Sequence, residues 1–483
     1  MQVKEFFVLR FFRLNDPYRL LGVLLLMIAI SLPMLFGPIA LTLQELKDMV
    51  LGEALNDGRV LYLQLIDDSP WLAALFAKWI EFIFGRSLSA RHLFALLILF
   101  FQASYFALAL IRNKAYNESN YLAALIFAIL CFFSFDMLSL SRELIASTFL
   151  LFALNILFKE IEFKVQRDET VLNIGVFIGI ASLFVFSYAL FLLGALVILY
   201  AFARISLRKA LLVVFGFVFP HSLLFCLYFF RDGLPQLCDF FYNTNFTFHT
   251  IAFVSWKSLV WLGGVILLFF FFSLVMLNRE ARFTRYQSQL LQVMMLWVLI
   301  ATIQITITRE RTPHSFITFI PPLTYFISHY ILLIRRKWIA EIMLWVFLFS
   351  VLGVSFAARA GKIKAVDYSN LFVPASANKS LVEKKVLVLA DDWGSYENNK
   401  VGSYFLNWDL SKEIFEHPEF YENIILINES FQSFPPDVII DRNGLMEKVF
   451  VRLPLLKTQY QIKVPYSLSG REKIYVRRML YNH

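Results

Sequence analysis

The sequence predicts an all-α polytopic membrane domain followed by a small extracytoplasmic α/β domain at its C-terminal end. Of the 483 residues, 59% are hydrophobic and 54 are phenylalanine, and the mean hydropathy is +0.65. Long apolar runs alternate with short charged links up to about residue 360, and the segment from 376 onward lacks this pattern. A water-soluble protein does not carry so much apolar sequence, so we expect an integral membrane protein.

About eleven apolar segments are long enough to cross roughly 30 Å of hydrocarbon. They lie at 20–41, 92–111, 121–138, 144–158, 171–186, 188–203, 210–230, 257–277, 287–307, 315–334 and 338–357. The long stretch around Phe186-Ser187-Tyr188 forms either two short helices with a tight break or one span with a re-entrant piece, and the two helices are favoured. The first segment has no small-residue cleavage site, so we expect it to be retained.

Lys and Arg residues orient these segments, because basic residues in short loops stay on the cytoplasmic side. They occupy every second link, from Lys4–Arg19 at the start to Arg335–Lys337 near the end. We therefore expect a cytoplasmic N-terminus and a C-terminal domain on the other side, which in a bacterial inner membrane is the periplasm. The net charge of +9 serves this topology and gives no reason to expect a nucleic-acid partner.

The expected domains are a membrane domain at 1–360, a linker at 361–375 and a periplasmic domain at 376–483. In the last, "KKVLVLADDW" predicts a strand, "FLNWDLSKEIFEHPEF" a helix, "YENIILIN" a second strand, and "PPDVIIDRNGLMEKVFVRL" a third strand with a helix. This alternation predicts a small α/β layer. Its acids could form a site at the strand ends, but solubilising or capping roles are favoured, because no glycine-rich loop follows the first strand. These acids are Asp391, Asp392, Asp437 and Asp441.

The first outer loop, expected at 44–91, is too long for a hinge. A hinge between helices needs only a few residues, yet about 27 polar and amphipathic residues precede "WLAALFAKWIEFIFG". That stretch is too short and too charged to span a membrane and is typical of an interfacial helix. The loop is therefore interpreted as the mouth of a site, and the alternative is a solvated connector.

In this loop the chain resembles the GT-C superfamily of polytopic glycosyltransferases, which use polyprenyl-phosphate-linked sugars. The likeness lies in "LGEALNDGRVLYLQLIDDSPWLAALFAKWIEFIFGRSLSARHLFALL": an acidic cluster, a G…LY…D…P pattern, an interfacial helix and an RH start to the next helix. "DMLSLSRELIASTFLLFALNIL" and "TRERTPHSFITFIPPLTYFI" resemble a second outer loop and the entry to a late helix. The tail resembles that of uncharacterised multi-pass proteins of Bacteroidetes.

The resemblance implies transfer of a sugar from a polyprenyl-phosphate carrier to an acceptor on the periplasmic side. The implied partners are the polyprenyl-phosphate-linked sugar, membrane lipid, and a glycan, lipid or protein acceptor. The cofactor stays unknown. A divalent metal suits this chemistry, but no ligand spacing indicates a metal site, and Cys131, Cys226 and Cys238 form no disulfide framework.

The reaction needs a base for the acceptor hydroxyl, and a carboxylate in a partly buried loop suits that role. The family carries an acidic pair soon after its first helix, where this chain has Leu43-Gln44. Either an acid of the loop takes the role or the catalytic acid is absent. The candidate bases are Glu45, Asp48, Asp67 and Asp68.

The departing phosphate needs positive charge, which arginine supplies with a fixed bidentate geometry. Arg309, Arg311 and His314 are expected at the outer end of an apolar segment, with Arg142 and Glu143 at a similar depth. These five are the candidate substrate-binding residues. The alternatives are arginines that snorkel to the interface and an ion pair that only joins helices.

Two other functions stay open. One is a non-catalytic scaffold for secretion or envelope assembly on the same frame, which the missing acidic pair favours. The other is a transporter, which predicts mid-membrane charges and an internal repeat, and the sequence shows neither.

Overall fold

The computed structural model describes residues 7–35, 41–163, 167–247, 250–280, 283–374, 382–463 and 473–478. The chain divides into two compact units. Unit 1 comprises Met1–Ala40, Ser87–Leu224 and Phe248–Leu371, and unit 2 comprises Leu41–Arg86, Phe225–Thr247 and Phe372–His483. Unit 2 therefore combines most of the first outer loop with a middle segment and the C-terminal part of the chain. The end of the expected linker and the start of the expected C-terminal domain, at 375–381, lie outside the described residues.

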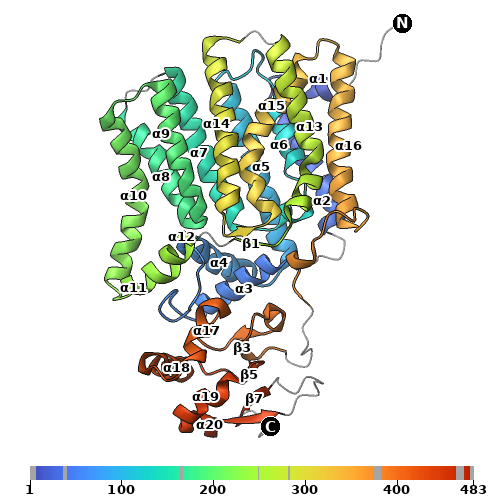
Figure 1. Ribbon diagram of the computed structural model, residues 1–483. Helices are drawn as coiled ribbons and strands as arrows, with labels where there is room; N and C mark the ends of the chain where they lie inside the picture. Colours follow the sequence, from blue (N-terminus) through green and yellow to red (C-terminus); the bar gives the residue numbers. More distant parts are fainter. Residues whose placement is uncertain are drawn as a thin grey trace. The chain divides into compact units, whose positions relative to one another are not determined.

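Unit 1 is a bundle of long helices (Figure 1). These are α1 (Phe7–Arg13), α2 (Arg19–Leu35), α5 (Leu88–Arg112), α6 (Leu122–Leu130), α7 (Arg142–Phe163), α8 (Asp168–Phe184), α9 (Leu190–Ile198), α10 (Leu207–Phe229, ending in unit 2), α13 (Trp256–Glu280), α14 (Arg285–Ile307), α15 (Ile320–Leu333) and α16 (Lys337–Arg359). Eight of the described segments are long and apolar enough to cross a membrane, compared with about eleven expected, and α2 is a shorter apolar helix. The stretch around Ser187 forms two helices, α8 and α9, with the 3-10 turn η2 (Phe186–Ala189) between them.

The expectation of one continuous span at 121–138 is wrong. Helix α6 ends at Leu130 after nine residues, and a turn and the 3-10 helix η1 (Phe135–Leu138) follow. Every residue of α6 is buried, and the helix packs against α2, α5, α15 and α16. A segment enclosed by protein does not need an unbroken helix, because neighbouring groups satisfy its backbone where lipid does not reach.

One end of unit 1 is built from short elements between the helices. Strand β1 (Ile251–Ala252) precedes α13 and pairs in parallel with β2 (Glu310–Arg311). The 3-10 helix η5 (Pro313–Phe319) follows β2 and leads into α15. This pairing places the arginines of the loop after α14 beside the start of α13.

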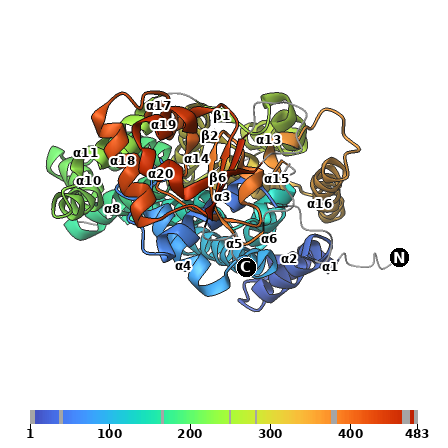
Figure 2. The same cartoon turned by 90° about the horizontal axis from the view of Figure 1, so that it is seen from below.

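Unit 2 contains a helical part and an α/β part. The helical part has α3 (Leu43–Asn56), α4 (Trp71–Phe84), α11 (Leu234–Leu237), the π-helix η4 (Cys238–Asn243) and α12 (Thr244–Phe246). The α/β part has β3 (Lys385–Leu389), β4 (Lys400–Val401), α17 (Trp408–Glu416), α18 (Tyr421–Ser433), β5 (Val438–Asp441), α19 (Leu445–Arg452), α20 (Pro454–Gln459), β6 (Tyr460–Lys463) and β7 (Lys473–Arg477). The strand order is β4-β3-β5-β7-β6, with β3, β4 and β5 parallel. Helix α20 leads directly into β6 (Figure 2).

The α/β layer is present, but one of its expected strands is wrong. "YENIILIN" begins helix α18, because its inward-facing residues Ile427, Ser430 and Phe431 recur at helical spacing and continue beyond the apolar run. The antiparallel pair β6–β7 was not expected from the sequence.

Ile66 of the first outer loop lies in the hydrophobic core of the α/β part, with Leu387, Phe405 and Ile439, and Phe240 packs against it. Three separate segments of the chain therefore share one core.

Candidate functional site

The loop between α3 and α4 holds Asp67, a candidate acid that is buried and has a raised pKa. Asp67 is 5% exposed, and its Oδ2 accepts a hydrogen bond from the backbone N–H of Ser69 at 3.0 Å. Burial, and then the charge of Asp68, raise the pKa of Asp67 to about 6, while the ammonium group of Lys47 opposes this rise. A carboxyl group with a pKa near neutrality is well suited to accept a proton.

Buried aromatic rings hold this loop in an unusual conformation. The backbone of Tyr62 has a φ of 66°, in the left-handed region that residues other than glycine rarely adopt. Its hydroxyl donates to the carbonyl of Ser69 at 2.6 Å, and its ring packs against Tyr228 and Phe241. The Tyr228 hydroxyl in turn donates to the carbonyl of Leu61 at 3.0 Å. Such local strain persists only where surrounding contacts enforce it, and it is common at functional sites.

The two acids on α3 have different surroundings. Thr42 and Glu45 form a capping box at the start of α3, in which the Glu45 carboxylate accepts from the backbone N–H of Thr42 at 3.1 Å and from its hydroxyl at 2.7 Å. These bonds give Glu45 a structural role at the helix terminus. Asp48 is half-buried on the next turn.

In unit 1, Arg142 and Glu143 belong to an ion network. Arg142 Nη2 pairs with the carboxylate of Glu310, and Arg142 Nε lies 3.4 Å from Glu143 Oε1. The Arg142 side chain is 16% exposed and that of Glu143 only 4%. Arg142 therefore joins the first turn of α7 to strand β2. Such an ion pair between elements is the alternative to substrate binding that the sequence left open.

His314 is also engaged by neighbouring groups. It is 1% exposed, and its two ring nitrogens lie 2.9 Å from Ser139 Oγ and 3.0 Å from Ser141 Oγ. Nε2 also contacts the carbonyl of Asp136, which can only accept, so Nε2 carries a proton. In the neutral ring Nδ1 then accepts from the Ser141 hydroxyl. His314 thereby ties η5 to the segment before α7.

Arg311 differs from these groups because its cation lies at an aromatic surface. Its guanidinium centre is 4.3 Å from the centroid of the Trp256 ring, and its Nε has no hydrogen-bond partner among the described residues. Burial lowers its pKa, but arginine remains charged at neutral pH. Arg309 is half-buried, and its backbone carbonyl accepts from the N–H of Ile251 at 2.7 Å.

Trp256 also lines an apolar cavity of about 300 Å³ among α13, α14 and α15. Its walls include Gly263, Phe270 and Thr302, and Leu267 on its rim is 51% exposed. From Trp256 to Phe270 the helix rises about 21 Å, at 1.5 Å per residue. The cavity thus extends along a membrane-length helix from a residue that contacts Arg311.

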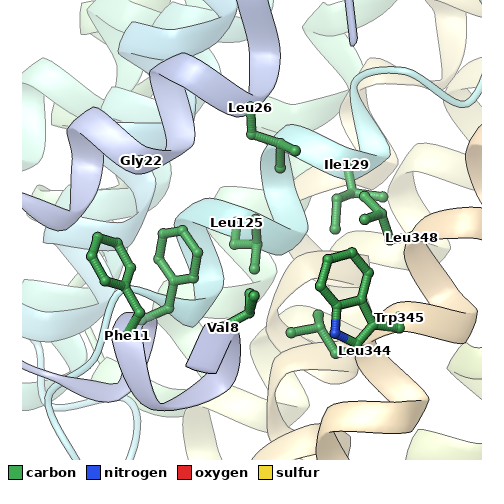
Figure 3. Close-up of a pocket in the computed structure, with 10 residues that line it drawn as sticks. Val8, Phe11, Gly22, Leu26, Leu125, Ile129, Leu344, Trp345 and Leu348 are labelled. Carbon is green, nitrogen blue, oxygen red and sulfur yellow. The ribbon is translucent and has the colours of Figure 1, made fainter. Parts of the chain in front are cut away.

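A second cavity of unit 1, of about 240 Å³, lies among α1, α2, α6 and α16 (Figure 3). Phe11, Leu125 and Trp345 are among the side chains around it, and Gly22 backs onto it. The guanidinium of Arg19 lies 4.1 Å from the centroid of the Phe11 ring. No candidate site residue lines this cavity.

No metal-binding group was found: within the described ranges, no three His, Cys, Asp or Glu side chains are placed to hold an ion together. The acids at the strand ends of the α/β part have structural partners. Asp441 accepts from the backbone N–H groups of Leu445 and Met446 at the start of α19, and Asp392 pairs with Arg442. Capping therefore accounts for Asp441.

A family model described as "Family of unknown function (DUF6427)" matches residues 64–364, more than half of the chain. The chain belongs to this family. No curated protein matches the sequence.

Among solved structures, the chain is similar to ArnT from Cupriavidus metallidurans bound to undecaprenyl phosphate. The identity is 12%, the TM-score is 0.55, and the match covers 94% of this chain and 98% of that chain. The apo state of the same protein has the same identity and coverage and a TM-score of 0.54. An oligosaccharyltransferase from Archaeoglobus fulgidus has 10% identity and a TM-score of 0.47, over 92% of this chain and 73% of that chain.

The two ArnT structures show that this chain shares their fold, which confirms the GT-C-like fold that the resemblance implied. Its long apolar helices make it a multi-pass membrane protein. Sequence reasoning did not single out Lys47 or Trp256, and it included Tyr62 only as part of the G…LY…D…P pattern. Their role comes from contacts with residues distant in sequence.

Proposed function

We propose that this chain is a membrane glycosyltransferase that moves a sugar from a polyprenyl-phosphate carrier to an acceptor on the periplasmic side of the inner membrane. The observation that carries the proposal is the Arg311 cation on the ring of Trp256, beside an apolar cavity along α13. A polyprenyl phosphate has this pairing of one anionic group with a long apolar chain. The similar fold of ArnT, solved with undecaprenyl phosphate bound, supports the same ligand class.

In the proposed reaction a carboxylate accepts the proton of the acceptor hydroxyl. The acceptor oxygen then bonds to the anomeric carbon of the sugar, and the bond from that carbon to the phosphate oxygen breaks. The polyprenyl phosphate leaves with the bonding electrons. Asp67 is our candidate for the base, because it is buried and its pKa of about 6 is close to neutrality.

Arg311 is our candidate for stabilising the leaving phosphate, together with Arg309 two residues before it. Arg142, Glu143 and His314 support the strand and turns around these arginines through the contacts described above. Asp48 on α3 and Asp68 in the loop between α3 and α4 stay as further candidates for the base.

Binding of undecaprenyl phosphate to the purified full-length chain tests the ligand class. Loss of a charged hydrogen bond is worth about 1.5–3 kcal/mol, so Arg311→Ala should weaken binding roughly tenfold to hundredfold. Arg311→Lys should restore only part, because lysine lacks the planar fork. Lys364→Ala, which removes an exposed cation of unit 1, is the control. If wild type and Arg311→Ala bind undecaprenyl phosphate equally, Arg311 is an interfacial arginine that does not bind the phosphate. If the wild type neither binds this lipid nor transfers a sugar, the non-catalytic scaffold is favoured.

A further inference from the structure

The loop between α3 and α4, residues 57–70, binds the α/β part of unit 2 on both sides of Asp67. On the N-terminal side, Arg59 Nη2 donates to the carbonyl of Val401 at 2.8 Å, and its guanidinium lies 4.3 Å from the centroid of the Phe434 ring. The side chain of Arg59 is fully buried. This contact joins residues more than three hundred positions apart in sequence.

Next to Asp67 the loop pairs with the backbone before α17. Ile66 forms a parallel bridge with Phe405: its N–H donates to the carbonyl of Tyr404 at 2.7 Å, and its carbonyl accepts from the N–H of Asn407 at 3.1 Å. The loop thus adds a short strand-like segment to the α/β part. The side chain of Ile66, buried in the core there, locks the register of this pairing.

Asn407 then reaches the acidic pair with its side chain. Its Nδ2 donates to Asp68 Oδ1 at 2.8 Å, and its Oδ1 accepts from the backbone N–H of Asp409 at 3.1 Å as the N-cap of α17. A backbone N–H can only donate, so the amide oxygen must face the helix and the NH2 group must face Asp68. Both halves of the amide are therefore used, and its orientation is fixed by the helix.

Several groups around Asp67 bear on its charge. They are Asp68 next to it in sequence, Lys47 on α3, the side chain and backbone N–H of Ser69, and the hydroxyl of Tyr62. Among these charges, that of Asp68 has the largest effect on the pKa of Asp67. The size of this effect depends on where the Asp68 carboxylate is held. A hydrogen bond that holds the Asp68 side chain beside Asp67 therefore helps to keep the pKa of Asp67 raised.

We propose that Asn407 is a positioning residue that holds the acidic pair, which makes the C-terminal α/β part a working component of the transfer machinery. Asn407 does not touch the reacting atoms and acts through Asp68. This inference rests on the proposed function, in which Asp67 is the base. It assigns a role to a region that the sequence presents only as a soluble appendage.

Asn407→Ser tests the proposal in the full-length chain. Serine still caps α17, because its hydroxyl can accept from the N–H of Asp409, but it is too short to reach Asp68. Asp68 then loses the hydrogen bond that holds it beside Asp67, so the pKa of Asp67 should fall. The acid limb of the pH profile of kcat/KM should move down by about 0.5 unit or more, and the plateau should fall about fivefold because the base is weaker. The matched control is Asn423→Ser, which removes the hydrogen bond from another asparagine side chain of the α/β part to the carbonyl of His417.

A second readout makes the result independent of transfer. Infrared titration of the Asp67 carboxyl band, assigned with Asp67→Asn, should show the same downward shift in Asn407→Ser and none in the control. If the wild type transfers no sugar but this midpoint moves, the positioning role stands and the proposed function fails. An unmoved midpoint in a folded Asn407→Ser protein overturns the positioning role.

If Asn407→Ser does not fold, Asp68→Asn tests the same link from the other side. It removes the charge near Asp67 while leaving Asn407 in place as the cap of α17. The midpoint for Asp67 should again fall. An unchanged midpoint overturns the proposal here as well.

Discussion

Replacing Asp67 with asparagine separates the chemistry of this side chain from its effect on folding. Asparagine keeps the shape and an oxygen that can accept from the N–H of Ser69, but it cannot take up a proton. If Asp67 is the base, transfer should fall about a hundredfold or more. The same variant should be more stable than the wild type at neutral pH, because burial of the charged carboxylate is unfavourable.

The size of this stabilisation follows from the two pKa values. The carboxyl has an ordinary pKa of 3.8, which we take for the unfolded chain, and about 6 in the folded protein. Because the folded pKa is raised, the free energy of unfolding is highest below about pH 4 and falls as the pH rises through about 6. The total fall is about 3 kcal/mol, at 1.36 kcal/mol per pK unit. Asparagine does not titrate, so the variant escapes this loss.

Thermal unfolding of the full chain in nanodiscs, followed at about pH 4 and about pH 7.5, measures the effect. With roughly 2–4 °C per kcal/mol, Asp67→Asn should raise the Tm of unit 2 by about 6–12 °C at the higher pH and by little at the lower one. Asp391→Asn, at an exposed acid of the same unit, should show no such difference. A variant that is less stable than the wild type at about pH 7.5 would refute a buried, charged Asp67.

Two further substitutions test the frame of the loop. Arg86→Ala should lower the free energy of unfolding by about 2–3 kcal/mol, because Arg86 binds both carboxylate oxygens of Glu53 and the backbone carbonyls of 396–399. Arg86→Lys should recover only part in the same thermal measurement, and an unchanged Tm in Arg86→Ala would contradict the clamp. Glu45→Gln preserves the capping box with Thr42, so transfer should stay within about twofold of wild type. A hundredfold loss in Glu45→Gln would instead make Glu45 the base.

The sequence was sufficient for features that depend on local pattern. Apolar length and the basic links identified a multi-pass membrane protein, and the first outer loop was recognised as too long for a hinge. The strands at β3 and β5 and the helices α17 and α19 followed from local periodicity. Asp67 and Asp68 are also neighbours in the chain, so some effect of one charge on the other does not depend on distant segments.

Glu45 and Asp67 are both buried, and the tertiary structure decided what surrounds each of them. Glu45 and Asp67 are both carboxylates in one segment, yet one completes a helix cap and the other is desolvated beside a like charge. The bond from Asn407 to Asp68 spans 339 positions, and no local pattern encodes such a pairing. The apolar run at the start of α18 was likewise ambiguous until its packing partners chose the helix. Burial and charge are properties of the surroundings, and distant segments supply those surroundings only after the chain has folded.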